Sequence, residues 1–169
     1  ISNKLPKKRQ TLLFSATMPS KIRRLAQDIL INPASISLAI SKPAPGIFQS
    51  AYLVNNEQKV RLIRDILKNK ENEKPLSHVL IFASSIKSVK EIKKTLNKSG
   101  FKSSDMHSEL NQDQREETIR DFKSKKIRIL VATDILSRGI DIKGIELVIN
   151  YEVPHDAEDY VHRIGRTAR

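Results

Sequence analysis

The chain contains 169 residues, of which 38% are hydrophobic and 30% are charged, and these values fit a soluble globular domain with a proper core. It contains no cysteine, so a disulfide framework, a thiolate zinc site and a cysteine nucleophile are excluded. The formal net charge of +12 favours a polyanionic partner, although a solvated basic surface would give the same charge.

The sequence also argues against a metal site and a membrane segment. Its four histidines do not follow the spacing of a zinc-binding motif. Apolar runs such as 79–83 are far shorter than the roughly 20 residues of a membrane helix, and no signal peptide is evident. We therefore expect no metal, no membrane contact and a cytoplasmic location. Because residue 1 is Ile rather than Met, we also expect a fragment of a longer protein.

Residues 1–40 contain one predicted strand and one predicted helix. The strand is the apolar run 11–14, and the helix follows Pro19, which suits a first helical turn. The apolar residues of this helix recur at helical spacing and stop before Asn32 and Pro33.

Residues 41–47 are predicted to form a linker, because two prolines and a glycine leave little room for regular structure. From there to residue 169, predicted strands alternate with predicted helices. The strands are expected at 48–54, 78–83, 103–107, 127–132 and 147–152. The helices are expected at 155–164 and on the periodic apolar residues Val60, Ile63, Ile66, Leu67, Ile86, Val89, Ile92, Leu96, Ile119 and Phe122.

Two local signals fit this alternation. Gly100 is expected to cap the helix before it, and Asn111 with Gln114 can form a capping box that opens the next helix. Strand–helix alternation with continuous apolar strands predicts an α/β fold, a parallel sheet flanked by helices, over 48–169. In such sheets ligands gather at the carboxyl ends of the strands.

The loop at 133–141 follows one of the predicted buried strands. It brings together a hydroxyl, two carboxylates, a guanidinium and a glycine, on Thr133, Asp134, Asp141, Arg138 and Gly139. The glycine lets a backbone approach a ligand closely, and an acidic residue can accept hydrogen bonds from a ribose. The alternative for the loop by itself is a polar turn with a helix cap.

The last eight residues, HRIGRTAR (162–169), carry three arginines spaced by three. A guanidinium stays charged at any working pH and binds phosphate through two parallel hydrogen bonds. Gly165 is a candidate interruption of the helix, and Arg163 is a candidate structural residue. Taken alone, these eight residues suit a solvated basic helix end better than a phosphate site.

Several segments in order and spacing give the chain a strong resemblance to the second RecA-like domain of DEAD-box RNA helicases. The resemblance covers nearly the whole chain and is most specific in ATDILSRGID (132–141), LVINYEVP (147–154) and EDYVHRIGRTAR (158–169). In the family's terms the matching elements are motif III at 15–19, motif IV at 79–85, Q-x-x-R at 112–115, motif V at 132–141 and motif VI at 162–169.

This resemblance implies a RecA-like helicase C-terminal domain of the P-loop NTPase class at 48–169, preceded by the end of a first RecA-like domain at 1–40. It also implies roles for individual residues. The arginine fingers for the γ-phosphate of ATP would be Arg166 and Arg169. Further contacts to ATP would come from Gly139 and Asp141. The RNA backbone would be faced by Ser84, Gln112, Arg115 and Thr133. The two domains would be coupled through Ser15, Thr17, Arg138 and His162.

Structural alternatives remain for some of these residues. Gln112 and Arg115 could only cap and decorate a helix, and Ser84 could be only an N-cap. Ser15 and Thr17 could be turn formers.

One position departs from the family pattern: Ala168 stands where glycine is usual. A left-handed backbone there would strain alanine, whereas a helical one would favour it, and we expect the helical one.

The sequence lacks two elements that such a helicase needs. None of its five glycines is followed by lysine, so no phosphate-cradling loop of the form G-x-x-x-x-G-K-[ST] is present, and there is no D-E-x-D. We therefore expect ATP and Mg²⁺ to be bound mainly by the first RecA-like domain, which with RNA is the expected partner.

The sequence thus predicts an inactive part of an ATP-dependent RNA helicase that unwinds short duplexes, a part that supplies arginine fingers and half of the RNA-binding track. The alternatives are a DNA-directed helicase of similar architecture and a non-catalytic module that binds RNA or protein.

Overall fold

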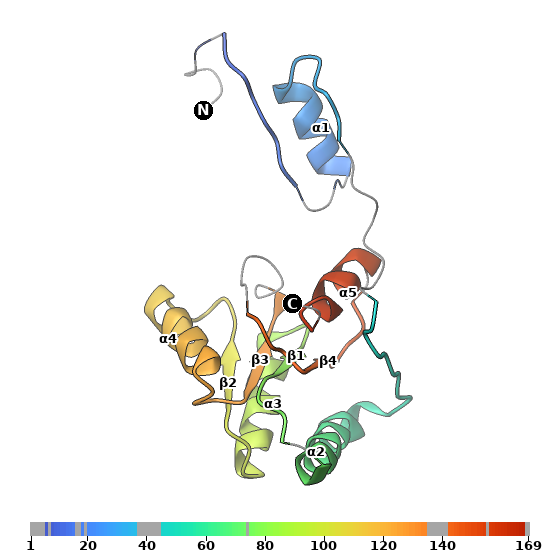
Figure 1. The fold of residues 1–169 in the computed structure, drawn as a ribbon, viewed down its shortest axis with the longest axis vertical. Helices are drawn as coiled ribbons and strands as arrows, with labels where there is room; N and C mark the ends of the chain where they lie inside the picture. The colour runs from blue at the N-terminus through green and yellow to red at the C-terminus, as the bar shows by residue number, and fades with distance from the viewer. Residues whose placement is uncertain are drawn as a thin grey trace. The chain divides into compact units, whose positions relative to one another are not determined.

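The computed structural model describes residues 6, 8–15, 18, 20–36, 45–73, 75–134, 142–154 and 156–167. The chain divides into two compact units, Ile1–Ile40 and Ser41–Arg169, and each is described by itself (Figure 1). The predicted assignment of 1–40 to a separate RecA-like domain is not tested by this division and stays a prediction.

The first unit contains the predicted helix, α1 (Ser20–Ile29), but not the predicted strand at 11–14. Asn32, with a left-handed φ of 45°, follows the helix, as the sequence signal indicates. Residues 11–14 are irregular, and Phe14 is 89% exposed. A strand is stable only beside a hydrogen-bonded neighbour, and the described residues of this unit offer none.

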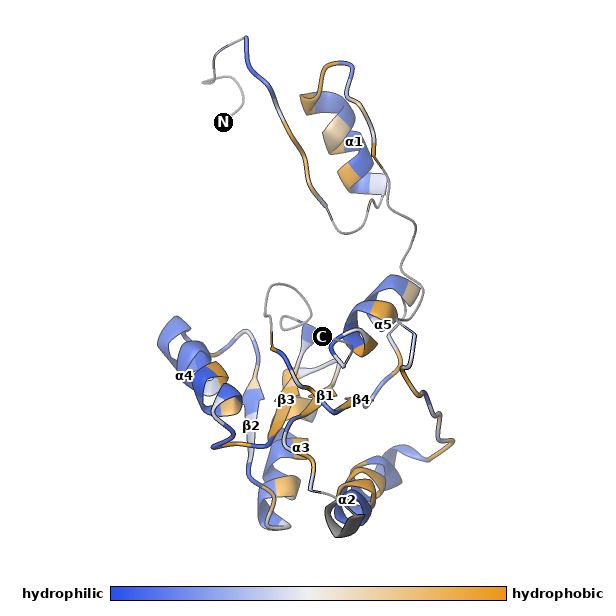
Figure 2. Cartoon of the chain, viewed as in Figure 1, coloured by the Kyte–Doolittle hydropathy of each residue, from blue (hydrophilic) through white to orange (hydrophobic). Residues whose placement is uncertain are grey.

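The second unit is built on a parallel sheet of four strands, which confirms the predicted α/β fold. The strands are β1 (Val79–Phe82), β2 (Ser103–Met106), β3 (Ile129–Ala132) and β4 (Leu147–Asn150), in the order β2-β3-β1-β4. All residues of the central strands β1 and β3 are buried, as continuous apolar runs predict. In Figure 2 both of these strands carry the hydrophobic colour.

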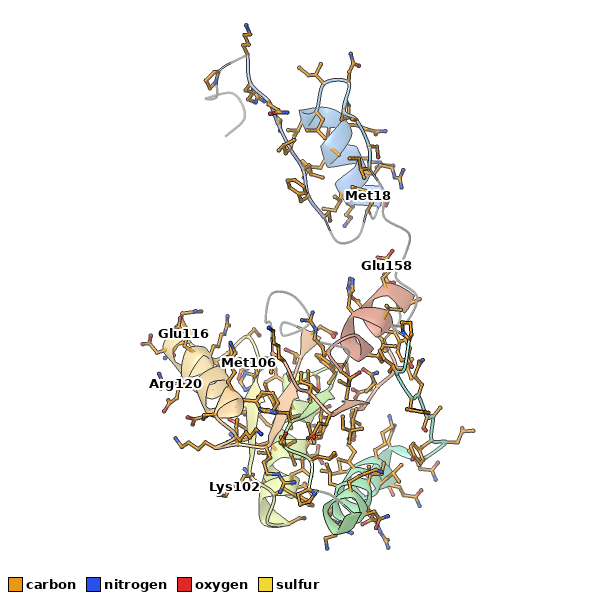
Figure 3. The ribbon with its side chains drawn as sticks, viewed as in Figure 1. Met18, Lys102, Met106, Glu116, Arg120 and Glu158 are labelled. Atoms are coloured by element: carbon orange, nitrogen blue, oxygen red, sulfur yellow. The ribbon has the colours of Figure 1, made fainter. Side chains whose placement is uncertain are left out.

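Helices cover both faces of the sheet. The helices are α2 (Asn56–Glu73), α3 (Ile86–Lys98), α4 (Gln112–Lys123) and α5 (Ala157–Ile164). One apolar cluster joins α2 and α3 to β1 and β3, and the other joins α4 to the opposite face. Met106 of β2 belongs to the second cluster, whereas Glu116 and Arg120 lie on the outer side of α4 (Figure 3).

Both predicted capping signals are confirmed. Gly100 has a φ of 88° directly after the C-cap Ser99 of α3, a conformation that glycine adopts without strain. Asn111 accepts a hydrogen bond from the backbone N–H of Gln114, whose side chain accepts one from the backbone N–H of Asn111.

The strand predicted at 48–54 is wrong for this structure. These residues are irregular, and Phe48 and Leu53 are fully exposed. The apolar pattern supports an extended segment, but no described strand lies beside it to complete the hydrogen-bond ladder.

Arg163 connects α5 to three strands of the sheet. Its side chain is 3% exposed, and its guanidinium lies 5.1 Å from the centre of the Phe82 ring. Nε and Nη2 bind the same carboxylate oxygen of Asp134, at 2.8 and 2.6 Å. Nη1 donates to the Asn150 side chain at 3.1 Å and to the Glu152 carbonyl at 3.2 Å. This arginine therefore ties the ends of β1, β3 and β4 to one helix.

Replacing Arg163 with methionine should lower the free energy of unfolding by about 3 kcal/mol, because the Asp134 carboxylate, the Asn150 side-chain oxygen and the Glu152 carbonyl lose a buried donor. Urea-induced unfolding measures this effect. Arg120→Met is the matched control, since Arg120 is exposed on α4, and it should change stability by less than about 0.5 kcal/mol. Equal effects of the two substitutions would contradict the structural role of Arg163.

Candidate functional site at the carboxyl edge of the sheet

The carboxyl ends of the four parallel strands meet at one edge of the sheet. In the register of the sheet, Phe82 lies beside Ala132 and Asn150, and Ala132 lies beside Met106. The residues that follow these positions therefore share the edge. They include two of the predicted RNA contacts, Ser84 and Thr133.

Thr133 and Arg115 reach this edge from different elements. The backbone N–H of Thr133 donates to the carbonyl of Met106 at 3.1 Å. Arg115, in the first turn of α4, donates from Nη2 to the carbonyl of Ser108 in the loop after β2, at 3.0 Å. The structure thus brings Arg115 to the loop beside the strand end that carries Thr133.

Both side chains keep a buried polar atom that has no partner among the described residues. These atoms are Oγ1 of Thr133 and Nε of Arg115. An unsatisfied buried polar group costs about 1–3 kcal/mol, so its retention needs a reason. Both groups can donate a hydrogen bond, which suits an acceptor such as a phosphate oxygen.

Ser84 and Gln112 are exposed and have partners of their own. The backbone N–H of Ser84 donates to the Glu152 carboxylate at 2.9 Å. The N-cap of α3 is Ser85, so the alternative that Ser84 is only an N-cap is wrong. Gln112 donates to the Glu116 side chain, four residues further along α4, at 2.7 Å. Its capping role belongs instead to Asn111.

The C-terminal arginine segment is interrupted as predicted. Helix α5 ends at Ile164, and Gly165 is its C-cap. Arg166 follows with 7% exposure, and its backbone N–H donates to the carbonyl of Arg163 at 3.2 Å. His162 is half-buried. A solvated basic helix end is therefore wrong for Arg163 and Arg166, which are both buried.

Part of the predicted site lies outside the described residues. This is so for Thr17, Arg138, Gly139, Asp141 and Arg169, and also for Ala168. Ser15 is described and exposed in the first unit. The roles of all these residues stay predictions.

Two features at the edge are not predicted by the sequence. Asp134 was assigned to the ligand-facing loop, whereas its carboxylate binds Arg163. The pair spans 29 positions of sequence, and no local pattern marks it. His107 directly follows β2, is 2% exposed, and has no partner for Nδ1 in the described part of the chain.

The described residues contain no cluster of three or more histidine, aspartate or glutamate side chains that could hold a metal ion. Within the same residues, no helix is long and apolar enough to cross a membrane.

Comparison with known proteins gives the family. The model of the helicase conserved C-terminal domain matches residues 58–169. A probable ATP-dependent RNA helicase of Methanocaldococcus jannaschii is 43% identical over 99% of this chain and 43% of its own length. DEAD-box ATP-dependent RNA helicase 40 of Oryza sativa subsp. japonica is 38% identical over 100% of this chain and 21% of its own length. The chain thus spans less than half of these relatives.

Comparison with solved structures finds the same kind of relative as comparison of sequences. S. cerevisiae Dbp5 bound to RNA and ADP BeF3 matches 99% of this chain and 44% of its own chain, with a TM-score of 0.82 and 28% identity. A DEAD-box protein from Methanococcus jannaschii matches 99% of this chain and 44% of its own, with a TM-score of 0.68 and 42% identity. The chain therefore belongs to the helicase conserved C-terminal domain family, and the relatives that it matches along its whole length are DEAD-box RNA helicases.

Proposed function

We propose that this chain contributes one half of the active site of an ATP-dependent RNA helicase. The full-length helicase would unwind short RNA duplexes while it hydrolyses ATP. The chain supplies arginine fingers and half of the RNA-binding track, and it is inactive alone. A cytoplasmic location is part of the same proposal.

The observation that supports this most is the pair of buried donors at the carboxyl edge. Oγ1 of Thr133 and Nε of Arg115 lack partners among the described residues. The phosphate oxygens of an RNA backbone are acceptors of the kind that these two donors lack. Ser84 and Gln112, which are exposed near the same strand ends, would extend the track. Contacts to phosphates carry no sequence information, so binding would be independent of RNA sequence and sensitive to salt.

Arg166 and Arg169 would act on the nucleotide. A guanidinium that binds γ-phosphate oxygens stabilises the negative charge that develops during phosphoryl transfer. The buried anchor of Arg163, three residues before Arg166, limits the freedom of the backbone that carries the first finger. Gly139 and Asp141 would contact the ribose and phosphate side of ATP.

ATP and Mg²⁺ would be held mainly by residues outside this sequence, which has neither a phosphate-cradling loop nor D-E-x-D. Ser15, Thr17, Arg138 and His162 would then couple this domain to the first RecA-like domain. Closure of the two domains around ATP would align both halves of the RNA-binding track. Bending of the RNA strand would therefore be coupled to the nucleotide that is bound.

The 169-residue chain alone should release no phosphate from ATP, with or without RNA, because only one side of the catalytic cleft is present. A phosphate-release assay measures this, with the full-length protein as the positive control. Turnover of the chain above the protein-free blank would contradict the proposal.

In the full-length protein, Arg166→Ala should lower ATP turnover by about a thousand-fold or more, in the range known for lost arginine fingers. Nucleotide binding should largely persist. Arg120→Ala, which removes an exposed guanidinium from α4, is the control and should leave turnover unchanged. Because Arg166 is buried, the unfolding midpoint is measured in parallel. Near-normal hydrolysis in a folded Arg166→Ala variant would reject the finger role.

RNA should stimulate the ATPase activity of the full-length protein more than DNA of the same sequence and length. This comparison separates the proposal from a DNA-directed helicase, for which DNA would be the better activator. A full-length protein that binds RNA but hydrolyses no ATP would instead be a non-catalytic binding module.

A further inference from the structure

A depression between α3 and β2 lies outside the residues assigned above. Basic side chains of α3 provide most of its lining, and β2 adds one carboxylate: Lys90, Lys93, Lys94, Asn97, Lys98 and Asp105. Four ammonium groups against one carboxylate leave the lining with a formal charge of +3. The depression therefore suits an anionic ligand.

The backbone beneath these lysines is held firmly. Oδ1 of Asn97 accepts hydrogen bonds from the backbone N–H and the hydroxyl of Ser103, at 3.0 and 2.8 Å, and Nδ2 donates to the Ser103 carbonyl at 3.3 Å. On the inner side of α3 the apolar residues Val89, Ile92 and Leu96 are buried. The lysines thus project from a helix fixed on two sides.

The four lysines differ in how their charge is balanced. Lys93 binds Asp105 at 2.8 Å, and that carboxylate is only 13% exposed. Burial raises the pKa of Asp105, but the hydrogen bond and the charge of Lys93 outweigh it, so the pKa stays below its ordinary value. This pair is part of the fold. Lys94 and Lys98 are exposed and have no carboxylate partner in the described part of the chain.

Lys90 is masked by a weaker contact. Its ammonium lies 2.6 Å from a carboxylate oxygen of Glu109, but both side chains are more than half exposed. Exposed ion pairs contribute about 0–1 kcal/mol, so a stronger anion can displace Glu109 at little cost. Lys90 is therefore available to a phosphate that competes with this carboxylate.

The spacing of the lysines fits a linear polyanion. Lys90, Lys94 and Lys98 follow one another at four-residue intervals, so they form a row about 12 Å long on one side of α3. Adjacent lysines of the row rise by about 6 Å along the helix axis, and their flexible side chains let them reach successive phosphates of a single strand. The lining has no aromatic side chain for base stacking, which again favours contacts to the backbone.

The row starts at the candidate site. Helix α3 begins at Ile86, two residues after Ser84 on the carboxyl edge, and its other end lies toward the start of β2, near Lys102 (Figure 3). A strand that leaves the edge beside Ser84 would meet Lys90 first and Lys98 last.

We propose that RNA leaving the carboxyl edge continues along α3, where its phosphates bind Lys94, Lys98 and, after displacing Glu109, Lys90. The surface binds RNA flanking the segment that is unwound, and it binds without regard to sequence. This inference rests on the proposed RNA-binding function of the carboxyl edge.

The test compares two RNAs with the full-length protein: a short one that fills only the carboxyl-edge track and one extended by a single-stranded flank. Lys94→Ala/Lys98→Ala should weaken binding of the extended RNA about ten-fold and make its dependence on salt less steep by about 1.4 in the log–log slope, for two lost phosphate contacts. Binding of the short RNA and the ATP turnover that it stimulates should not change.

The matched control is Lys68→Ala/Lys123→Ala, which removes the same charge from exposed positions on α2 and α4. It should leave both RNAs unaffected, so that a general effect of net charge is excluded. Equal weakening by control and test variants, or unchanged binding of the extended RNA in the test variant, would overturn the inference. If the short RNA does not bind even to the unmodified protein, the proposed function fails as well.

Glu109→Gln gives an independent test of opposite sign. Removing the carboxylate that masks Lys90 should strengthen binding of the extended RNA and leave that of the short RNA unchanged, whereas no gain for the extended RNA would overturn the masking role. Inorganic tripolyphosphate distinguishes RNA from a small anion. If Lys94→Ala/Lys98→Ala weakens binding of tripolyphosphate but not of extended RNA, the depression serves a small polyphosphate instead.

Discussion

The buried guanidinium of Arg163 holds together the edge on which the candidate site is built. It lies against the Phe82 ring at the end of β1. It also donates hydrogen bonds to the carboxylate of Asp134 after β3 and to two acceptors at the end of β4. A guanidinium holds its N–H donors in one plane and binds all of these acceptors at once, which the ammonium group of a lysine could not do. Arg166 follows in the turn after α5, where its backbone N–H donates to the carbonyl of Arg163.

The edge that Arg163 stabilises also carries polar groups that have no hydrogen-bond partner in the described part of the chain. Thr133 and Arg115 each hold a buried donor without a partner among the described residues, while the polar groups around Ser103 and Asn97 are paired. These two unsatisfied donors lie near the ends of parallel strands, whereas the paired groups of Ser103 and Asn97 lie between a helix and a strand. Unpaired donors at the open edge are the expected cost of a site for an acceptor-rich ligand.

Helix α3 serves two purposes through its two sides. Its apolar side packs in the core with β1 and β3, and its outer side presents a row of lysines. The lysines of this row can gain or lose an anionic partner without disturbing the core, because among them and Lys93 only Lys93 pairs with a largely buried carboxylate. An RNA track that extends along this helix would therefore lie on rigid structure rather than on a loop.

The sequence by itself determined the features that depend on near neighbours. Buried strands such as β1, the helix α3, the capping box of Asn111 and the left-handed Gly100 all follow from residue patterns within a few positions. Tertiary structure decided the rest. The runs 11–14 and 48–54 have strand-like patterns but no hydrogen-bonded neighbour, and Arg163 is buried only because Asp134 and Asn150 are brought to it from distant positions. A strand and a buried charge both need partners from elsewhere in the chain, and local pattern does not specify which partners arrive.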